Sequence, residues 1–156
     1  VESYELTDKS VSSSKIREAL QKGDMLLANG YLGYNFRFSG TVIRGEGMGS
    51  SFGFPTANIK LKNKNKIIPK EGVYAVIVYY NEQQYQGMIN IGYNPTLNKN
   101  KLSIEVHIFN FHKSIYGEEI KVEFIKRIRS EKKFQTTEEL KNQLAADKIT
   151  SLNLLR

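Results

Sequence analysis

The fold of this chain is decided by residues 73–80, which read Val-Tyr-Ala-Val-Ile-Val-Tyr-Tyr. β-Branched and aromatic side chains dominate this run, and these are the side chains that pack best on a pleated sheet. Asn81-Glu82-Gln83 follows and predicts a hairpin turn into a second strand over Tyr85–Ile91. The middle of the chain is therefore expected to form an antiparallel sheet.

Segments on either side of this hairpin alternate between apolar and polar residues, as half-buried strands do. The alternation predicts strands over Phe36–Ile43, Ser103–Phe111 and Ile120–Ile128. Within the second of these, one face is expected to carry Ile104, Val106, Ile108 and Asn110, and the other Glu105, His107, Phe109 and Phe111. About six short strands are expected in all.

Helical patterns are confined to the two ends of the chain. Near the start, Ser13 or Ser14 can cap a helix that ends at Gly23. Asp24 can cap a second, shorter helix that ends at Gly33. No such pattern separates the strands, so a parallel α/β sheet is disfavoured.

The last helix is predicted after residue 135, where Thr136 and Glu139 have the spacing of a capping box. Its buried stripe is expected to contain Leu140, Leu144, Ile149 and Leu152. Six short strands with helices only at the ends favour an antiparallel barrel with a flanking helix.

Composition places the chain among water-soluble domains. The 156 residues suit one domain, and 40% hydrophobic with 25% charged residues is an ordinary balance. No apolar run approaches the ~20 residues that a membrane helix needs, and no signal-peptide pattern is present. The absence of cysteine excludes disulfides and thiolate metal sites and fits a cytoplasmic location.

The chain is basic, with 23 Lys and Arg against 16 Asp and Glu and a net charge of +7. This excess favours anionic partners such as a polyphosphate or a nucleic acid, although a solvated lysine-rich surface would give the same count. The densest run, Lys60–Lys70, is typical of an exposed loop.

A glycine-rich stretch follows the first predicted strand. Residues 44–53 read Arg-Gly-Glu-Gly-Met-Gly-Ser-Ser-Phe-Gly and include Gly45, Gly47 and Gly49. Successive backbone N–H groups in such a loop can cradle phosphate oxygens. A plain hairpin loop would have the same composition, and neither a Walker loop nor a dinucleotide fingerprint is present.

Two polar side chains follow Pro55 at a spacing of two. Thr56 offers a hydroxyl and Asn58 a carbonyl oxygen, which point the same way if the segment is extended. Neutral oxygens suit Mg²⁺, because this ion keeps most of its shell for phosphates and water. The same residues could instead satisfy a turn.

Glu105 is a carboxylate within an otherwise β-branched and aromatic strand. If its side chain points into a barrel or its mouth, partial burial raises its pKa, as a general base requires. A glutamate on the solvent face of the strand is the alternative.

These segments occur in an order that resembles the riboflavin kinase family, in particular the kinase half of bacterial bifunctional riboflavin kinase/FAD synthetases. The resemblance runs from about Ala28 to the C-terminus. It is carried by the glycine-rich loop, Gly53-Phe54-Pro55-Thr56-Ala57-Asn58, Gly72-Val73-Tyr74-Ala75, Asn90-Ile91-Gly92 with Pro95-Thr96, Ile104-Glu105-Val106-His107, Tyr116-Gly117, and Arg129 with Lys132-Lys133-Phe134.

The resemblance implies a six-stranded antiparallel Greek-key barrel with a long C-terminal helix. It also implies an enzyme that transfers a phosphoryl group from MgATP to the ribityl 5′-hydroxyl of riboflavin, giving FMN and ADP. Glu105 matches the catalytic carboxylate, and Thr56 and Asn58 match the residues that hold Mg²⁺ and the ATP phosphates. The remaining implied ATP contacts are Gly45, Gly47, Gly49, Ile108, Asn110 and Tyr116.

For the flavin, the resemblance implies a closing loop that contains Arg129, Lys132 and Phe134. Two departures from the family pattern stand out. Ser50 and Ser51 occupy positions where many relatives have a basic residue, which leaves Arg44 or the backbone to meet the phosphates. Asn110 stands where a relative has a histidine.

Residues 11–17, Val-Ser-Ser-Ser-Lys-Ile-Arg, resemble the late signature of the adenylyltransferase half of the same bifunctional proteins. We therefore expect residues 1–27 to be the tail of an FMN adenylyltransferase domain with a linker, and 28–156 to be the kinase domain. The full-length parent is then expected to make FAD as well, whereas this chain is not. A simple capped helix start is the alternative for residues 12–17.

Two other functions fit parts of the sequence. A basic barrel that binds single-stranded nucleic acid would explain the net charge and the nine Tyr and eight Phe. It would not explain Pro55-Thr56-Ala57-Asn58, or a carboxylate at Glu105, which would repel phosphates. A flavin carrier without catalysis is the third possibility.

Overall fold

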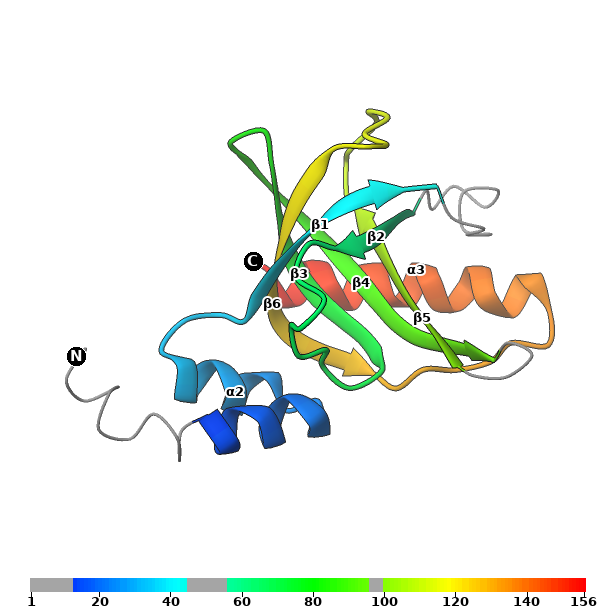
Figure 1. Ribbon diagram of the computed structural model, residues 1–156. Helices are drawn as coiled ribbons and strands as arrows, with labels where there is room; N and C mark the ends of the chain where they lie inside the picture. The colour runs from blue at the N-terminus through cyan, green and yellow to red at the C-terminus, as the bar shows by residue number, and fades with distance from the viewer. Residues whose placement is uncertain (1–12, 45–55, 96–99) are drawn as a thin grey trace.

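The computed structural model describes residues 13–44, 56–95 and 100–156. Residues 13–22 form a first helix, which Gly23 ends with a left-handed φ of 77°. The labelled elements are α2 (Met25–Leu32), β1 (Arg37–Ile43), β2 (Ala57–Leu61), β3 (Gly72–Tyr80), β4 (Gln83–Pro95), β5 (Asn100–Ile108), β6 (Glu119–Arg129) and α3 (Thr137–Leu154) (Figure 1).

The central hairpin is the expected one with a tighter turn. Tyr80 pairs with Gln83, so the turn has only Asn81 and Glu82 at its centre. Both have positive φ, 50° and 65°, which is the conformation of the two-residue turns that suit the twist of a hairpin. Gln83, expected in the turn, belongs to β4.

The six strands form a closed antiparallel barrel in the order β1-β2-β5-β4-β3-β6. In this order β6 lies beside β3, the first strand of the β3-β4-β5 meander, which is the Greek-key arrangement. The barrel expected from the sequence is therefore confirmed. The β2–β5 junction is short, with only two pairs in register, Ala57 with Val106 and Asn58 with Glu105.

The barrel interior is filled by alternate residues of every strand. An aromatic cluster lies at its centre, where the rings of Phe36, Phe38 and Tyr74 each meet Phe124 edge-on at 5.1–5.6 Å. The two N-terminal helices add to this same core with Ala19, Leu20, Met25 and Ala28. The division expected at residue 27 thus falls inside α2, which packs on the barrel.

Both caps of α2 follow expectation, whereas Ser13 and Ser14, expected to cap the first helix, lie within it. The carboxylate of Asp24 accepts the N–H of Leu27 at 3.1 Å, and Gly33 ends α2 with a φ of 80°. The side chain of Asn29 then joins α2 to the barrel, because it donates to the carbonyl of Phe124 and accepts from the N–H of Phe36.

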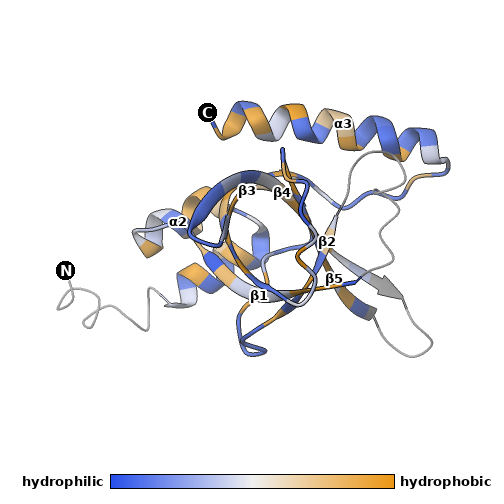
Figure 2. Ribbon diagram, turned by 90° about the horizontal axis from the view of Figure 1, so that it is seen from above, coloured by the Kyte–Doolittle hydropathy of each residue, from blue (hydrophilic) through white to orange (hydrophobic). Residues whose placement is uncertain are grey.

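Helix α3 lies along the outside of the barrel, as the view in Figure 2 shows. It covers a second apolar cluster of Val73, Met88 and Phe109 with Leu144, Leu152 and Leu155. The expected stripe is wrong at Ile149, which is 63% exposed. The residues of α3 that are fully buried are the polar Asp147 and Ser151, because the helix is oriented by an ion pair as well as by apolar contacts.

The strand expected over Ser103–Phe111 begins three residues earlier and ends at Ile108. Phe109 and Asn110 form a turn, and Asn110 has a φ of 55°. Asn110 is therefore not on the face of Ile108, as the alternation had predicted.

The capping box at the start of α3 is present in a modified form. The Thr136 hydroxyl accepts the N–H of Glu139 at 3.1 Å, and the Glu139 carboxylate accepts the N–H of Gln135. We expect Thr136→Ala to lower the free energy of unfolding by about 1 kcal/mol, because one helical N–H loses its acceptor. Urea denaturation measures this, and an unchanged midpoint would show that the cap contributes nothing.

None of the helices in the described part of the chain combines the length and apolar character needed to cross a bilayer.

Candidate active site

A row of three polar side chains crosses the barrel wall on strands β2, β5 and β4. Glu105 is paired with Asn58 on one side and with Asn90 on the other, so the three side chains leave the same face of the sheet. Their neighbours Ile104 and Val106 point into the barrel core. Glu105 therefore faces outward, so of the two alternatives left open by the sequence the structure does not show a side chain that points into the barrel.

The outward position of Glu105 is nevertheless a sheltered one. A cleft of about 250 Å³, the outer cleft, is lined by Asn90, Gly92, Tyr93, Ser103, Glu105, Glu131, Lys132 and Lys133. Burial raises the pKa of the Glu105 carboxyl above its ordinary value, and the neighbouring Glu131 carboxylate raises it further. The raised pKa expected of a general base is thus present, although its cause is the covering segment after β6.

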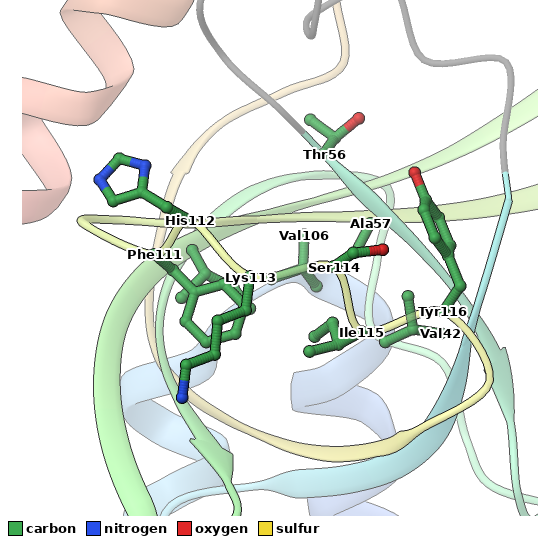
Figure 3. Close-up of a pocket in the computed structure, with 11 residues that line it drawn as sticks. Val42, Thr56, Ala57, Val106, Phe111, His112, Lys113, Ser114, Ile115 and Tyr116 are labelled. Carbon is green, nitrogen blue, oxygen red and sulfur yellow. The ribbon is translucent and has the colours of Figure 1, made fainter.

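A second cavity, of about 360 Å³, opens at one end of the barrel and is called the mouth cavity here. Figure 3 shows its side chains, which are Val42, Thr56, Ala57, Val106, Ile108, Phe111, His112, Lys113, Ser114, Ile115 and Tyr116. Val106 and Ile115 lie at its centre, Tyr116 stands at one side, and His112 points away from the group. The cavity has an apolar floor and a polar rim, as nucleotide sites do.

The two cavities share no lining residue, but both border β5, where Val106 lines the mouth cavity and Glu105 lines the outer cleft. Thr56 lines the mouth cavity, whereas Asn58, two residues on, lies beside Glu105 on the outer face. A ligand spanning the junction could therefore contact both residues.

The other expected nucleotide residues fall in three groups. Ile108 and Tyr116 line the mouth cavity, and Arg44 lies over the Tyr116 ring with its guanidinium carbon 4.5 Å from the ring centre. Asn110 is exposed and does not line this cavity. Gly45, Gly47 and Gly49 lie outside the described residues.

The expected flavin residues lie at the end of β6 and in the segment 130–136 that leads to α3. Lys132 and Phe134 line a groove between this segment and α3, and Lys132 also borders the outer cleft. The guanidinium carbon of Arg129 and the ammonium nitrogen of Lys132 each lie 5.9 Å from the centre of the Phe134 ring. Lys132 thus borders Glu105's cleft, and Phe134 lines the groove that shares Lys132 and Lys133 with this cleft.

Arg129 is engaged elsewhere in this structure. Its Nε lies 3.0 Å from both carboxylate oxygens of Asp147, its Nη2 lies 2.7 Å from Oδ2, and its Nη1 donates to the Ser130 carbonyl. Its role beside the flavin was expected from its place in the motif, whereas its observed side-chain hydrogen bonds go to Asp147 of α3 and to Ser130.

Sequence reasoning gave no role to Asn90 or Glu131, although both border the outer cleft. Asn90 was quoted within Asn90-Ile91-Gly92, and Glu131 lies between two residues of the expected flavin loop. A carboxylate flanked by Ser130 and Lys132 looks like a solvated turn, so the linear sequence carried no signal for it. Within the described residues, no donor reaches the buried Oδ1 of Asn90.

The donor set at the junction fits Mg²⁺ held mainly by phosphate. Thr56 and Asn58 supply neutral oxygens, and the described residues contain no group of three His, Cys, Asp or Glu that could form a protein cage. Mg²⁺ prefers such sites, in which a few protein oxygens supplement substrate phosphates and water.

Comparison with known proteins agrees with this geometry. Residues 32–155 match the family model described as riboflavin kinase. The chain belongs to the riboflavin kinase family.

Its matched relatives are bifunctional riboflavin kinase/FMN adenylyltransferases. That of Bacillus subtilis is 48% identical over 151 residues, covering 95% of this chain and 48% of the relative. That of Listeria monocytogenes is 46% identical, covering 88% of this chain and 44% of the relative. The chain thus spans about half the length of the relatives it matches. None of these matches supports the nucleic-acid-binding barrel.

Two solved structures resemble the fold. One, described as a macrolide-efflux protein from Streptococcus pneumoniae, has a TM-score of 0.85 and 36% identity, covering 90% of this chain and 46% of the other. The riboflavin kinase of Trypanosoma brucei has a TM-score of 0.52 at 22% identity, covering 76% of this chain and 78% of the other. The second likeness concerns the fold alone.

Proposed function

We propose that this chain transfers the γ-phosphoryl group of ATP to the 5′-hydroxyl of riboflavin, giving FMN and ADP. The observation that carries the proposal is the placement of Glu105. It is a sheltered carboxylate with a raised pKa, it lies beside Asn58, and it lines the outer cleft next to Val106, which lines the mouth cavity. A base between a flavin site and a nucleotide site is what this reaction requires.

Phosphoryl transfer needs the protein to position the reactants and to stabilise charge, and it needs no covalent bond to the protein. Glu105 accepts the proton of the 5′-hydroxyl as its oxygen bonds to the γ-phosphorus, and the bond from that phosphorus to the bridging oxygen of ADP breaks. A carboxylate whose pKa lies nearer to neutrality is a stronger base for this transfer. The walls of the outer cleft around Glu105 also limit the access of water that would compete with the flavin hydroxyl.

We propose that ATP occupies the mouth cavity, with its base near Ile108 and Tyr116. Its phosphates would then extend past Thr56 toward Asn58 and Glu105. Arg44, stacked on Tyr116 at the rim, is one cation placed to meet them, and Gly45, Gly47 and Gly49 follow it in the chain. Asn110 would take part only if its turn moves toward the nucleotide.

Thr56 and Asn58 would hold Mg²⁺ together with the phosphates. The ion, when bound, would neutralise charge on the transferred phosphoryl group, and Thr56 and Asn58 would set the position of the ion. The flavin ring would lie against Phe134, with Lys132 near its polar edge. We propose that Arg129 contributes through its hold on α3 and Ser130, and contacts the flavin only if that hold is released.

Replacement of Thr56 by alanine tests the metal assignment. We expect the Mg²⁺ concentration for half-maximal activity to rise by roughly tenfold or more, because one ion ligand is lost. The measurement is a Mg²⁺ titration of turnover at saturating riboflavin. Thr150→Ala, which removes an exposed hydroxyl on α3, is the matched control. An unchanged Mg²⁺ requirement in Thr56→Ala would refute the assignment.

The relatives also motivate proposals about a longer protein. We propose that residues 1–27 belong to the end of an FMN adenylyltransferase domain and its linker, and that 28–156 is the kinase domain. A full-length parent would then convert FMN to FAD in the cytoplasm, whereas this chain would stop at FMN.

The proposed activity is tested by release of ADP from ATP in the presence of Mg²⁺. We expect release only when riboflavin is added. Riboflavin binding without any release of ADP would instead support a carrier. Binding of single-stranded RNA that weakens steeply with salt, in protein that ignores riboflavin, would favour the nucleic-acid barrel.

A further inference from the structure

Glu131 is one of the residues of the outer cleft to which the proposed reaction gives no role. Its carboxylate lies against Gly92 of β4, so closely that a Cβ added at Gly92 would collide with Oε2. Gly92 has no positive φ that would require glycine. A larger residue at position 92 would therefore displace the Glu131 carboxylate from the place that it occupies.

The backbone of Glu131 is anchored as well. Its N–H donates to Oε2 of Glu71 at 2.7 Å. Arg127 holds Glu71 in turn, because its Nη2 donates to the Glu71 carbonyl at 2.6 Å and lies 3.6 Å from Oε1. Both the backbone and the side chain of Glu131 therefore have fixed contacts, immediately before Lys132 in the chain.

This placement has an electrostatic cost that a turn in open water would avoid. Glu105 and Glu131 line the same cleft, and the Glu131 carboxylate raises the pKa of Glu105. Glu131 as a residue is exposed, but partial burial of its carboxyl in the cleft raises its pKa, while the N–H of Lys132 and the side chain of Asn90 oppose this as hydrogen-bond donors. Unfavourable local arrangements, such as two carboxylates in one cleft, are expected mainly at functional positions.

We propose that Glu131 is a positioning residue for the flavin-binding segment: its carboxylate over Gly92, together with the bond from its N–H to Glu71, holds Lys132 and Phe134 beside the cleft of Glu105. The proposal rests on the proposed function. It predicts that displacing Glu131 weakens the use of riboflavin and leaves the use of ATP unchanged.

A double-mutant cycle between Gly92 and Glu131 tests this. In Gly92→Ala the new methyl group displaces the carboxylate, and in Glu131→Ala the carboxylate is absent. Each single variant is expected to raise the KM for riboflavin by roughly fivefold to tenfold, with the KM for ATP unchanged. In the double variant the methyl group has nothing to displace, so its KM should equal that of Glu131→Ala.

Multiplying effects in the double variant would overturn the proposal, because they would show that Gly92 acts without Glu131. So would an unchanged KM for riboflavin in both single variants, or an equal rise in both KM values. Gly30→Ala, where an added Cβ meets nothing within 4 Å, is the control for an added methyl group.

Glu71→Gln gives an independent measure if Gly92→Ala folds poorly. It removes the charge that holds Arg127 and is expected to raise the KM for riboflavin in the same direction; no change there would also count against the proposal. Wild-type protein that makes no FMN would refute the proposed function itself, whereas active wild-type protein with an uncoupled cycle would refute only the role of Glu131.

Discussion

Glu105→Ala is expected to lower the turnover number by about 10²–10⁴-fold, the usual contribution of a general base. Riboflavin binding should change little, because the carboxylate is one of several groups around the outer cleft. The measurements are turnover at saturating substrates and the quenching of riboflavin fluorescence on binding. A loss of binding with turnover retained would contradict the role of base.

A matched control separates the base from a general effect of removing negative charge. Glu119 begins β6, is exposed, and pairs with Lys62 at 3.4 Å on the surface. Glu119→Gln should leave turnover within about twofold, since exposed ion pairs contribute little. An equal loss in both variants would show that the effect at Glu105 is not specific to its position.

The second large effect is expected from Asp147→Ala, which should lower the free energy of unfolding by about 3–5 kcal/mol. Asp147 is 2% exposed and receives both the forked hydrogen bonds of Arg129 and a bond from Gln143. Its removal leaves a largely buried guanidinium without its partner, and that is the costly state. Urea denaturation followed by circular dichroism measures the change.

The double variant Arg129→Met with Asp147→Leu tests this explanation. It removes both charges and fills the space with apolar side chains, so we expect it to be more stable than Asp147→Ala alone. Should the double variant be the less stable of the two, the cost would lie in lost contacts of Arg129 and not in its unpaired charge.

Local chemistry explains why so much of the fold could be predicted from the sequence. The strand over residues 73–80, the cap at Asp24 and the capping pair at Thr136 depend on neighbouring residues, and all three are present. Ile149 was misplaced because the buried face of α3 is set by Asp147 and its partner Arg129, which lies 18 residues away in the chain.

The sequence was sufficient to name candidate residues of the site, but not to predict which of them are neighbours or which face of the sheet they occupy. The motif singled out Glu105 and Asn58, but only the register between β2 and β5 shows that they are direct neighbours on the outer wall. Asn110 was assigned to a strand face by alternation, which a turn with positive φ interrupts. Glu131 needed the packing of segment 130–136 against Gly92, which no linear pattern records.

The central claim, that this chain makes FMN, is tested most directly by identifying the product. The purified protein would be incubated with riboflavin, ATP and Mg²⁺, and the flavins separated by chromatography. We predict FMN in amounts that exceed the protein and depend on both ATP and Mg²⁺, without FAD. The absence of FMN, from protein shown by circular dichroism to be folded, would contradict the account.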